Sequence, residues 1–124
     1  MLPPQEDLDA RAPLWDVMQM FWMDTDPEYE VAVTAQTCAE SKYSIAELKR
    51  IFLNEVRPAV SFNLYAGPAP EWTGFELEWL KDRILKAHRF HKPLPLRIFH
   101  RYAYNWWGKL EGEIIKRRTH TSFD

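Results

Sequence analysis

The histidines are the first residues of this chain whose types and spacing could support metal chemistry. His88 and His91 are three residues apart, a spacing that places two imidazoles on one helix face, as metal ligands require. Lys86, Arg89 and Lys92 stand beside them, and no acidic residue occupies a familiar ligand spacing. Because this positive charge opposes cation binding, we expect a solvated helix end here and no metal site.

A cluster of carboxylates at a predicted helix junction is the second candidate, and it contains Asp24, Asp26, Glu28 and Glu30. Such a cluster could bind Mg²⁺, act as an acid–base pair, or present an acidic face to a protein partner. The pattern lacks the glycine and the distant glutamate of an EF-hand loop. Helix capping explains the last three residues without any chemistry, because acidic side chains stabilise a helix start.

Nucleophilic catalysis has little support in the sequence. Cys38 is the only cysteine, no base stands near it in the sequence, and small residues flank it, so we expect a buried, inert thiol. The G-x-S-x-G, P-loop and G-x-G-x-x-G motifs are absent. We therefore predict that the protein is not an enzyme and has no cofactor. The single cysteine and the absence of a long apolar run predict a cytoplasmic protein without a membrane span.

The charge of the chain is distributed unevenly along its length. Residues 1–40 carry nine acidic residues and one basic residue, whereas residues 81–124 carry eleven basic and four acidic residues. The basic third interleaves arginines with aromatic residues in "RIFHRYAYNWWGK", a combination that suits single-stranded nucleic acid. A net charge of only −2 lacks the basic footprint of a nucleic-acid binder. Alternatively, the uneven charge has no binding role, and the acidic and basic halves pack side by side and attract each other.

Helical periodicity and capping signals predict the elements that must position these residues. A first helix should begin near Pro13, and a second should begin after Asp26. Ser44 and Glu47 form a capping box for a third helix that Pro58 stops or bends. Thr73 and Glu76 repeat the capping box for a fourth helix with a stripe of Leu77, Leu80 and Ile84, and a fifth should span about residues 96–117.

These elements predict an all-α fold, a compact irregular bundle of about five helices in a single domain over residues 1–124. Residues 1–12 should form an irregular N-terminal arm, and residues 119–124 a frayed tail. The segment "AVSFNLY" (residues 59–65) alternates enough to permit a short strand within a loop.

Several stretches resemble a bacterial family of small uncharacterised proteins that is classed as a domain of unknown function. They are "DT" at residues 24–25, "YSIAELKRIFLNEVRP", "NL" at residues 63–64, and "AGPAPEWTGFELEWL". The resemblance covers roughly residues 13–85, and the final basic helix falls outside it. The family has no established activity, but small single-domain proteins of this kind are often immunity proteins, so the resemblance implies that role.

We therefore expect a non-enzymatic protein-binding module, an immunity protein that neutralises a bacterial toxin encoded nearby. Binding would occur through an acidic face, with contacts from Asp24, Asp26, Glu28, Tyr29 and Glu30. The alternative is a nucleic-acid-associated regulator that uses the basic C-terminal helix. Its contacts would be Arg97, Arg101, Lys109, Lys116, Arg117 and Arg118.

Overall fold

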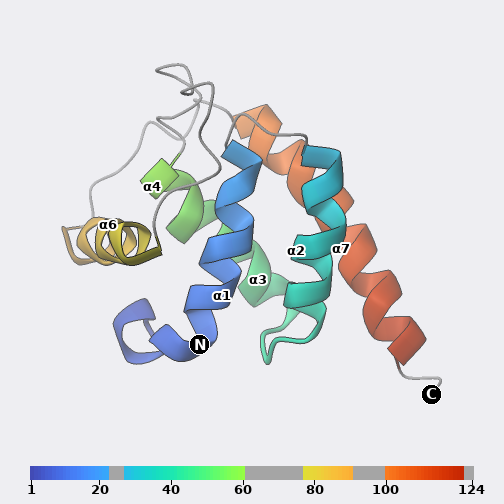
Figure 1. Cartoon of the computed structure of the whole chain (residues 1–124), viewed down its shortest axis with the longest axis horizontal. Helices are drawn as coiled ribbons and strands as arrows, with labels where there is room; N and C mark the ends of the chain where they lie inside the picture. Colours follow the sequence, from blue (N-terminus) through green and yellow to red (C-terminus); the bar gives the residue numbers. More distant parts are fainter. Residues whose placement is uncertain (23–26, 61–76, 91–99, 122–124) are drawn as a thin grey trace.

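Helices are the only regular secondary structure in the described part of the chain (Figure 1). The computed structural model describes residues 1–22, 27–60, 77–90 and 100–121. In chain order, the elements are a 3-10 turn at Pro4–Glu6, α1 (Leu8–Met18), a 3-10 extension at Gln19–Trp22, α2 (Pro27–Ala39), α3 (Ile45–Arg50), a π-helical stretch at Ile51–Val56, α4 (Arg57–Val60), α6 (Leu77–Phe90) and α7 (His100–Thr121). The prediction of a compact all-α bundle is confirmed.

The N-terminal segment is more regular than the irregular arm predicted for residues 1–12, and that prediction was wrong. α1 begins at Leu8, so Pro13 lies inside the helix rather than at its start. The N-cap residue Asp7 makes no side-chain capping bond. Its carboxylate instead accepts hydrogen bonds from Lys42 and Tyr43, far along the chain. No local capping signal therefore marks this start, and tertiary contacts hold it in place.

The C-terminal helix ends later than predicted, because α7 continues to Thr121. Residues 119–121, assigned to a frayed tail, are helical, while residues 122–124 lie outside the described residues. Ala59 and Val60, at the start of the possible short strand, are also helical, and residues 61–65 lie outside the described part. The predicted capping box of Thr73 and Glu76 falls in the same undescribed segment.

The core is built on α1 and its 3-10 extension. Five hydrophobic side chains there are completely buried: Leu14, Trp15, Met18, Phe21 and Trp22. Helical spacing in the sequence predicts a buried stripe of Leu14, Val17, Met18, Phe21 and Trp22, which contains four of these five but has Val17 in place of Trp15. Val17 is only half-buried. Because α1 packs against α2 on one side and α6 on the other, its buried surface is wider than a single stripe.

Aromatic rings join the core side chains of three helices. Phe52 meets Phe21 edge-on with ring centroids 5.6 Å apart, and its ring also contacts Trp22 at 4.9 Å and Trp107 at 5.9 Å. Such edge-to-face and tilted contacts stabilise by about 0.5–1.5 kcal/mol beyond the area they bury. In contrast, Trp79 on α6 stays 39 % exposed at the margin of the core.

The helix that contains α3 and α4 accommodates Pro58 instead of stopping at it. Before the proline, the ladder widens to a π-helix, and the Arg57 N–H bonds to the carbonyl of Phe52. The Leu53 carbonyl thereby loses its α-helical donor, and Pro58 has no N–H to replace it. The side-chain Nε of Arg57 donates to this carbonyl at 3.0 Å. An arginine side chain thus satisfies the acceptor that the proline leaves open.

The helices pack so that the acidic and basic parts of the sequence meet. α2 lies beside α1 on one flank and beside α7 on the other, and α6 lies across the far side of α1 (Figure 1).

The capping box of Ser44 and Glu47 is confirmed, since both of its reciprocal hydrogen bonds are present. It starts α3 directly after the turn that leaves α2.

Candidate functional site

The acidic start of α2 is the first region that the sequence singled out for binding. Asp24 and Asp26 lie outside the described residues. Glu28 and Tyr29 are exposed, and the Tyr29 side chain is 70 % exposed, the most of any large hydrophobic residue among those described. Glu30 is half-buried, and this burial raises the pKa of its carboxyl above the ordinary value. The described part of the region thus combines an exposed aromatic ring with two carboxylates.

The basic residues of α7 are largely directed at α2. Lys109 Nζ forms an ion pair with Glu28 Oε1 at 2.8 Å, and Arg117 Nη1 donates to Gln36 Oε1 at 2.8 Å. Lys116 pairs with Glu113 one turn earlier in α7. Arg101 is exposed, and Arg97 lies outside the described residues. The structure therefore brings one residue from each predicted site, Glu28 and Lys109, into contact with each other.

Arg118 closes the C-terminal end of α2. Its guanidinium donates to the carbonyl oxygens of Cys38 at 3.0 Å, Ala39 at 3.3 Å, Ser41 at 3.3 Å and Tyr43 at 2.6 Å. Cys38 and Ala39 end α2, where carbonyls lack intrahelical donors and a cation suits the negative end of the helix dipole, and Ser41 and Tyr43 follow in the connection to α3. Arg118 therefore fixes the connection between α2 and α3.

Cys38 lies under this connection and shows why the thiol is a poor nucleophile. The residue is completely buried. Burial raises the pKa of its thiol to about 12, although the nearby Arg118 charge acts in the opposite direction. The reactive thiolate is therefore scarce at neutral pH.

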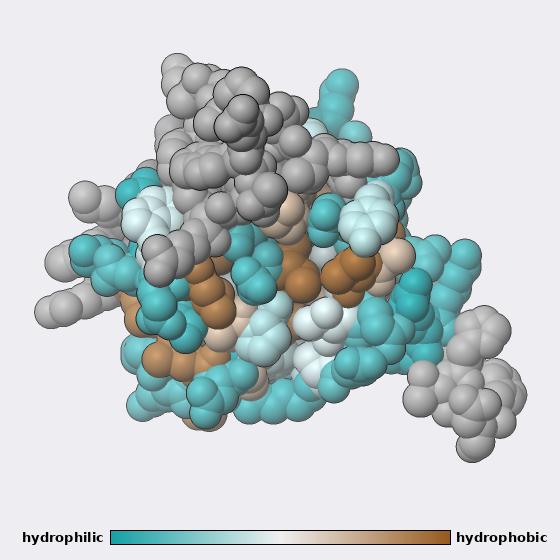
Figure 2. Space-filling model, in the orientation of Figure 1, coloured by the Kyte–Doolittle hydropathy of each residue, from teal (hydrophilic) through white to brown (hydrophobic). Residues whose placement is uncertain are grey.

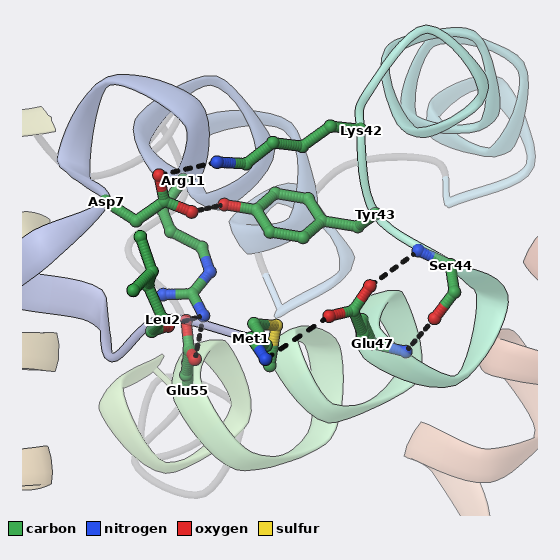
Figure 3. Close-up of polar contacts among 9 residues, drawn as sticks. All are labelled: Met1, Leu2, Asp7, Arg11, Lys42, Tyr43, Ser44, Glu47 and Glu55. Carbon is green, nitrogen blue, oxygen red and sulfur yellow. Dashed lines mark hydrogen bonds and ion pairs between the residues drawn. The ribbon is translucent and has the colours of Figure 1, made fainter.

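A polar network at the N-terminus escaped the sequence analysis (Figure 3). Arg11 is completely buried, and its Nη2 donates to the Leu2 carbonyl at 2.6 Å and lies 3.7 Å from Glu55 Oε2. Glu55 Oε1 accepts a hydrogen bond from Trp15 Nε1 at 2.9 Å. Desolvation raises the pKa of Glu55, opposed by the indole and the guanidinium. An arginine in a predicted irregular arm gave no signal of this burial.

The same network fixes Tyr43. Its hydroxyl and the ammonium of Lys42 both donate to Asp7, with the Lys42 contact at 2.8 Å. The Lys42 bond and then the Tyr43 bond hold the pKa of Asp7 below its usual range. Figure 3 shows the Tyr43 ring between Lys42 and Arg11. The Arg11 guanidinium lies 5.3 Å from the ring centroid, within the range of a cation–π contact.

A shallow groove of about 360 Å³ lies between α1 and the C-terminal end of α2, and we call it the α1–α2 groove. Asp9, Ala10, Pro13 and Leu14 line the α1 side. Thr37, Glu40 and Ser41 line the α2 side, and Lys42 and Tyr43 follow them. Figure 2 looks onto these two helices and shows hydrophobic and near-neutral surface between them, with hydrophilic residues around it. This groove could not be predicted from the sequence, because its walls come from residues 9–14 and residues 37–43, which are far apart in the chain.

Metal ligands and membrane spans were also sought in the described part of the chain. Among those residues, no three histidine, cysteine or carboxylate side chains lie close enough together to hold a metal ion. None of the described helices combines the length and the apolar composition needed to cross a membrane. His91 lies outside the described residues.

One comparison with known proteins identifies the family. Residues 9–119 match the family model described as "Domain of unknown function (DUF7079)". The chain belongs to the DUF7079 family. The predicted resemblance to a family of unknown function is confirmed to that extent, but its range of residues 13–85 was too short. The basic helix α7 lies within the DUF7079 domain, in keeping with its packing along α2. No curated protein and no solved structure matches the chain.

Proposed function

We propose that this DUF7079 protein is a non-enzymatic, cytoplasmic binding module, an immunity protein that neutralises a bacterial toxin. Binding would occur through the acidic start of α2, which includes Glu28, Tyr29 and Glu30 and is preceded in the sequence by Asp24 and Asp26. The observation that carries the proposal is Tyr29, which is 70 % exposed between two carboxylates.

Tyr29 has the properties of an interface anchor. Tyrosine is enriched among the few residues that dominate binding energy, because its large, rigid ring loses little entropy on burial. Tyr29 and Val33 are four residues apart on one outward ridge of α2, Glu40 follows seven residues later directly after the helix ends, and all three are exposed. A ridge with an aromatic anchor and acidic neighbours suits a basic protein surface.

The charges near Tyr29 would act mainly on the rate of association. Exposed carboxylates steer a basic partner toward the surface, and this effect weakens as salt shortens the Debye length. Glu28 already has an intramolecular partner in Lys109, but the pair is exposed and contributes only about 0–1 kcal/mol to stability. A partner cation can therefore compete for Glu28 at little cost to the fold.

The cations of α7 support protein binding over the nucleic-acid alternative. Lys109, Arg117 and Arg118 each make contacts with α2 or with the connection that follows it. Phosphate would displace the exposed Lys109 pair at as little cost as a partner cation would at Glu28, so the difference between the two functions lies in Arg118. Since Arg118 donates to four carbonyls, its use for phosphate would leave a helix end unsatisfied.

The test is to mix the purified protein with the candidate toxin encoded by the neighbouring gene. The dissociation constant is measured by calorimetry, and the association rate is measured by rapid mixing. We expect a complex, an association rate that falls between about 50 and 300 mM salt, and at least about tenfold weaker binding for Tyr29→Ala. Tyr104→Ala is the matched control, because Tyr104 is 41 % exposed on α7. The proposal would be overturned if no complex formed at both salt concentrations, or if both variants lost the same amount of affinity.

A further inference from the structure

The hydroxyl groups that line the α1–α2 groove all donate hydrogen bonds within the chain. Thr37 donates its hydroxyl to the Val33 carbonyl at 3.1 Å, and Ser41 donates to the Cys38 carbonyl at 2.6 Å. The Tyr43 hydroxyl donates to Asp7. Each of these three hydroxyls therefore donates its hydrogen bond to an acceptor within the chain. Only their oxygen lone pairs remain available to a ligand.

The charged groups of the groove add further acceptors. Asp9 stands on the α1 wall and Glu40 on the α2 wall, and both are exposed. Neither carboxylate forms an ion pair with the described residues; Glu40 accepts one hydrogen bond, from Gln36 Nε2 at 2.6 Å. A carboxylate has about four acceptor positions. Most of the hydrogen-bonding capacity of these two groups is therefore open to a donor.

Among the described residues, Lys42 is the one cation that lines the groove, and its charge opposes that of the carboxylates. Its ammonium points at Asp7 (Figure 3), and the two charges form an ion pair at 2.8 Å. The pair neutralises most of the field of Lys42 at a distance, because its members carry opposite charge. Asp9 and Glu40 then give the groove a net negative character.

The apolar part of the groove indicates what kind of cation would fit. Ala10, Pro13 and Leu14 line one side, and they offer no hydrogen-bonding side-chain groups. Lysine and arginine side chains carry a long aliphatic stem below a charged head, and they bury the stem on apolar surface while the head stays at a polar edge. A bare metal ion would leave this apolar side unused.

We propose that the α1–α2 groove receives a lysine or arginine side chain of a basic protein partner. Its stem would lie along Ala10 and Pro13, and its head between the carboxylates of Asp9 and Glu40. The inference rests on the proposed function for the identity of the partner. Glu40 lies eleven residues after Tyr29, directly beyond the end of α2, and about 16 Å away at the rise of an α-helix. One interface of ordinary size, about 800 Å² on each partner, can cover both sites.

The closing experiment uses hexalysine as the probe and does not need the natural partner. We would follow the amide resonances of the ¹⁵N-labelled protein during a titration at low salt. The largest shifts should fall in residues 9–14 and 37–43, and the double variant Asp9→Asn/Glu40→Gln should bind hexalysine about five- to tenfold more weakly. The matched control, Glu78→Gln/Asp82→Asn on α6, also removes two negative charges, but away from the groove. Its affinity for hexalysine should change less than about twofold.

A third variant separates cation binding from anion binding in the groove. Lys42→Gln removes a positive charge that repels hexalysine, so this variant should bind hexalysine more strongly. A groove that binds anions through Lys42 would instead bind hexaglutamate, and the variant would lose that binding. Urea unfolding of each variant checks that the fold is intact. Shifts confined to Tyr29 and its neighbours would overturn the groove but leave the proposed function standing. Equal losses in the double variant and its control would also overturn the groove.

Discussion

Arg118, near the end of α7, donates a hydrogen bond at 2.6 Å to the carbonyl oxygen of Tyr43, which lies 75 residues earlier in the chain. Tyr43 in turn donates through its hydroxyl to Asp7, at the start of α1. One residue therefore connects the last helix to the first through the turn between α2 and α3.

Arg118→Ala should destabilise the protein by about 2–3 kcal/mol, because four carbonyls lose a charged donor at once. Arg118→Lys should recover only part of this loss, since an ammonium cannot reproduce the planar fork of a guanidinium. Urea unfolding followed by circular dichroism measures both changes. Lys116→Ala is the control, because that exposed residue pairs only with Glu113 among the described residues, and its removal should cost less than about 0.5 kcal/mol. Equal effects at the two positions would contradict this account.

Glu55→Gln should destabilise the protein by about 3 kcal/mol, because it leaves the buried Arg11 guanidinium without its anion. Glutamine keeps an oxygen that can accept the hydrogen bond of Trp15, so the loss reports the charge rather than the indole contact. The double variant Arg11→Met/Glu55→Gln should be more stable than the sum of the two single changes indicates. Additive free energies of unfolding in this cycle would show that the two charges do not interact.

The lowered pKa of Asp7 predicts how the free energy of unfolding changes in acid. Its folded pKa lies below the ordinary value of 3.8, so the stabilisation is complete above the unfolded pKa and is lost as the pH falls through the folded pKa. Asp7→Asn should therefore flatten the fall of the unfolding free energy below about pH 4. Tyr43→Phe removes one of the two hydrogen bonds that lower this pKa, so the folded pKa moves closer to the unfolded value, and the fall should be smaller and end at a higher pH. Urea unfolding between pH 2.5 and pH 7 gives both profiles.

The matched control for this pH series is Asp82→Asn. Asp82 is an exposed carboxylate on α6 that pairs with Lys86. An acid profile changed equally by Asp7→Asn and Asp82→Asn would mean that Asp7 has no special part in acid stability.

Cys38 should react slowly with iodoacetamide at pH 8 in the native protein. Its thiol is buried, and its pKa is raised to about 12, so few thiolates form and few are accessible. The reaction rate, measured by mass spectrometry, should rise steeply across the urea unfolding transition. Rapid labelling in the absence of urea would contradict the inert role of this thiol.

Nucleic-acid probes should bind weakly. Three of the six residues of the basic-helix hypothesis already contact α2 or the turn after it, which leaves fewer charges for phosphates. Labelled single- and double-stranded probes in a salt series should show little dependence of the binding constant on salt. A steep negative slope that Arg101→Ala and Lys116→Ala both reduce would favour the nucleic-acid regulator instead.

Some parts of the fold could be predicted because their signals are local. The capping box of Ser44 and Glu47 needs partners only three residues apart, and the structure contains both of its bonds. Periodicity similarly identified Leu14, Met18 and Phe21 as core residues, since one helix face must be buried. The start of α1 was missed because its cap residue, Asp7, bonds to Lys42 and Tyr43 instead of to its own helix.

The amino-acid sequence by itself determined the helical class of this protein, most of its buried face and the uneven distribution of its charge. Only the tertiary structure decided what the charges do, because their partners lie far apart along the chain. It brought Lys109 to Glu28 over 81 residues and Arg11 to Glu55, and it formed a groove between Asp9 and Glu40. Composition records how many charges exist, but the Coulomb energy depends on the distances that packing creates.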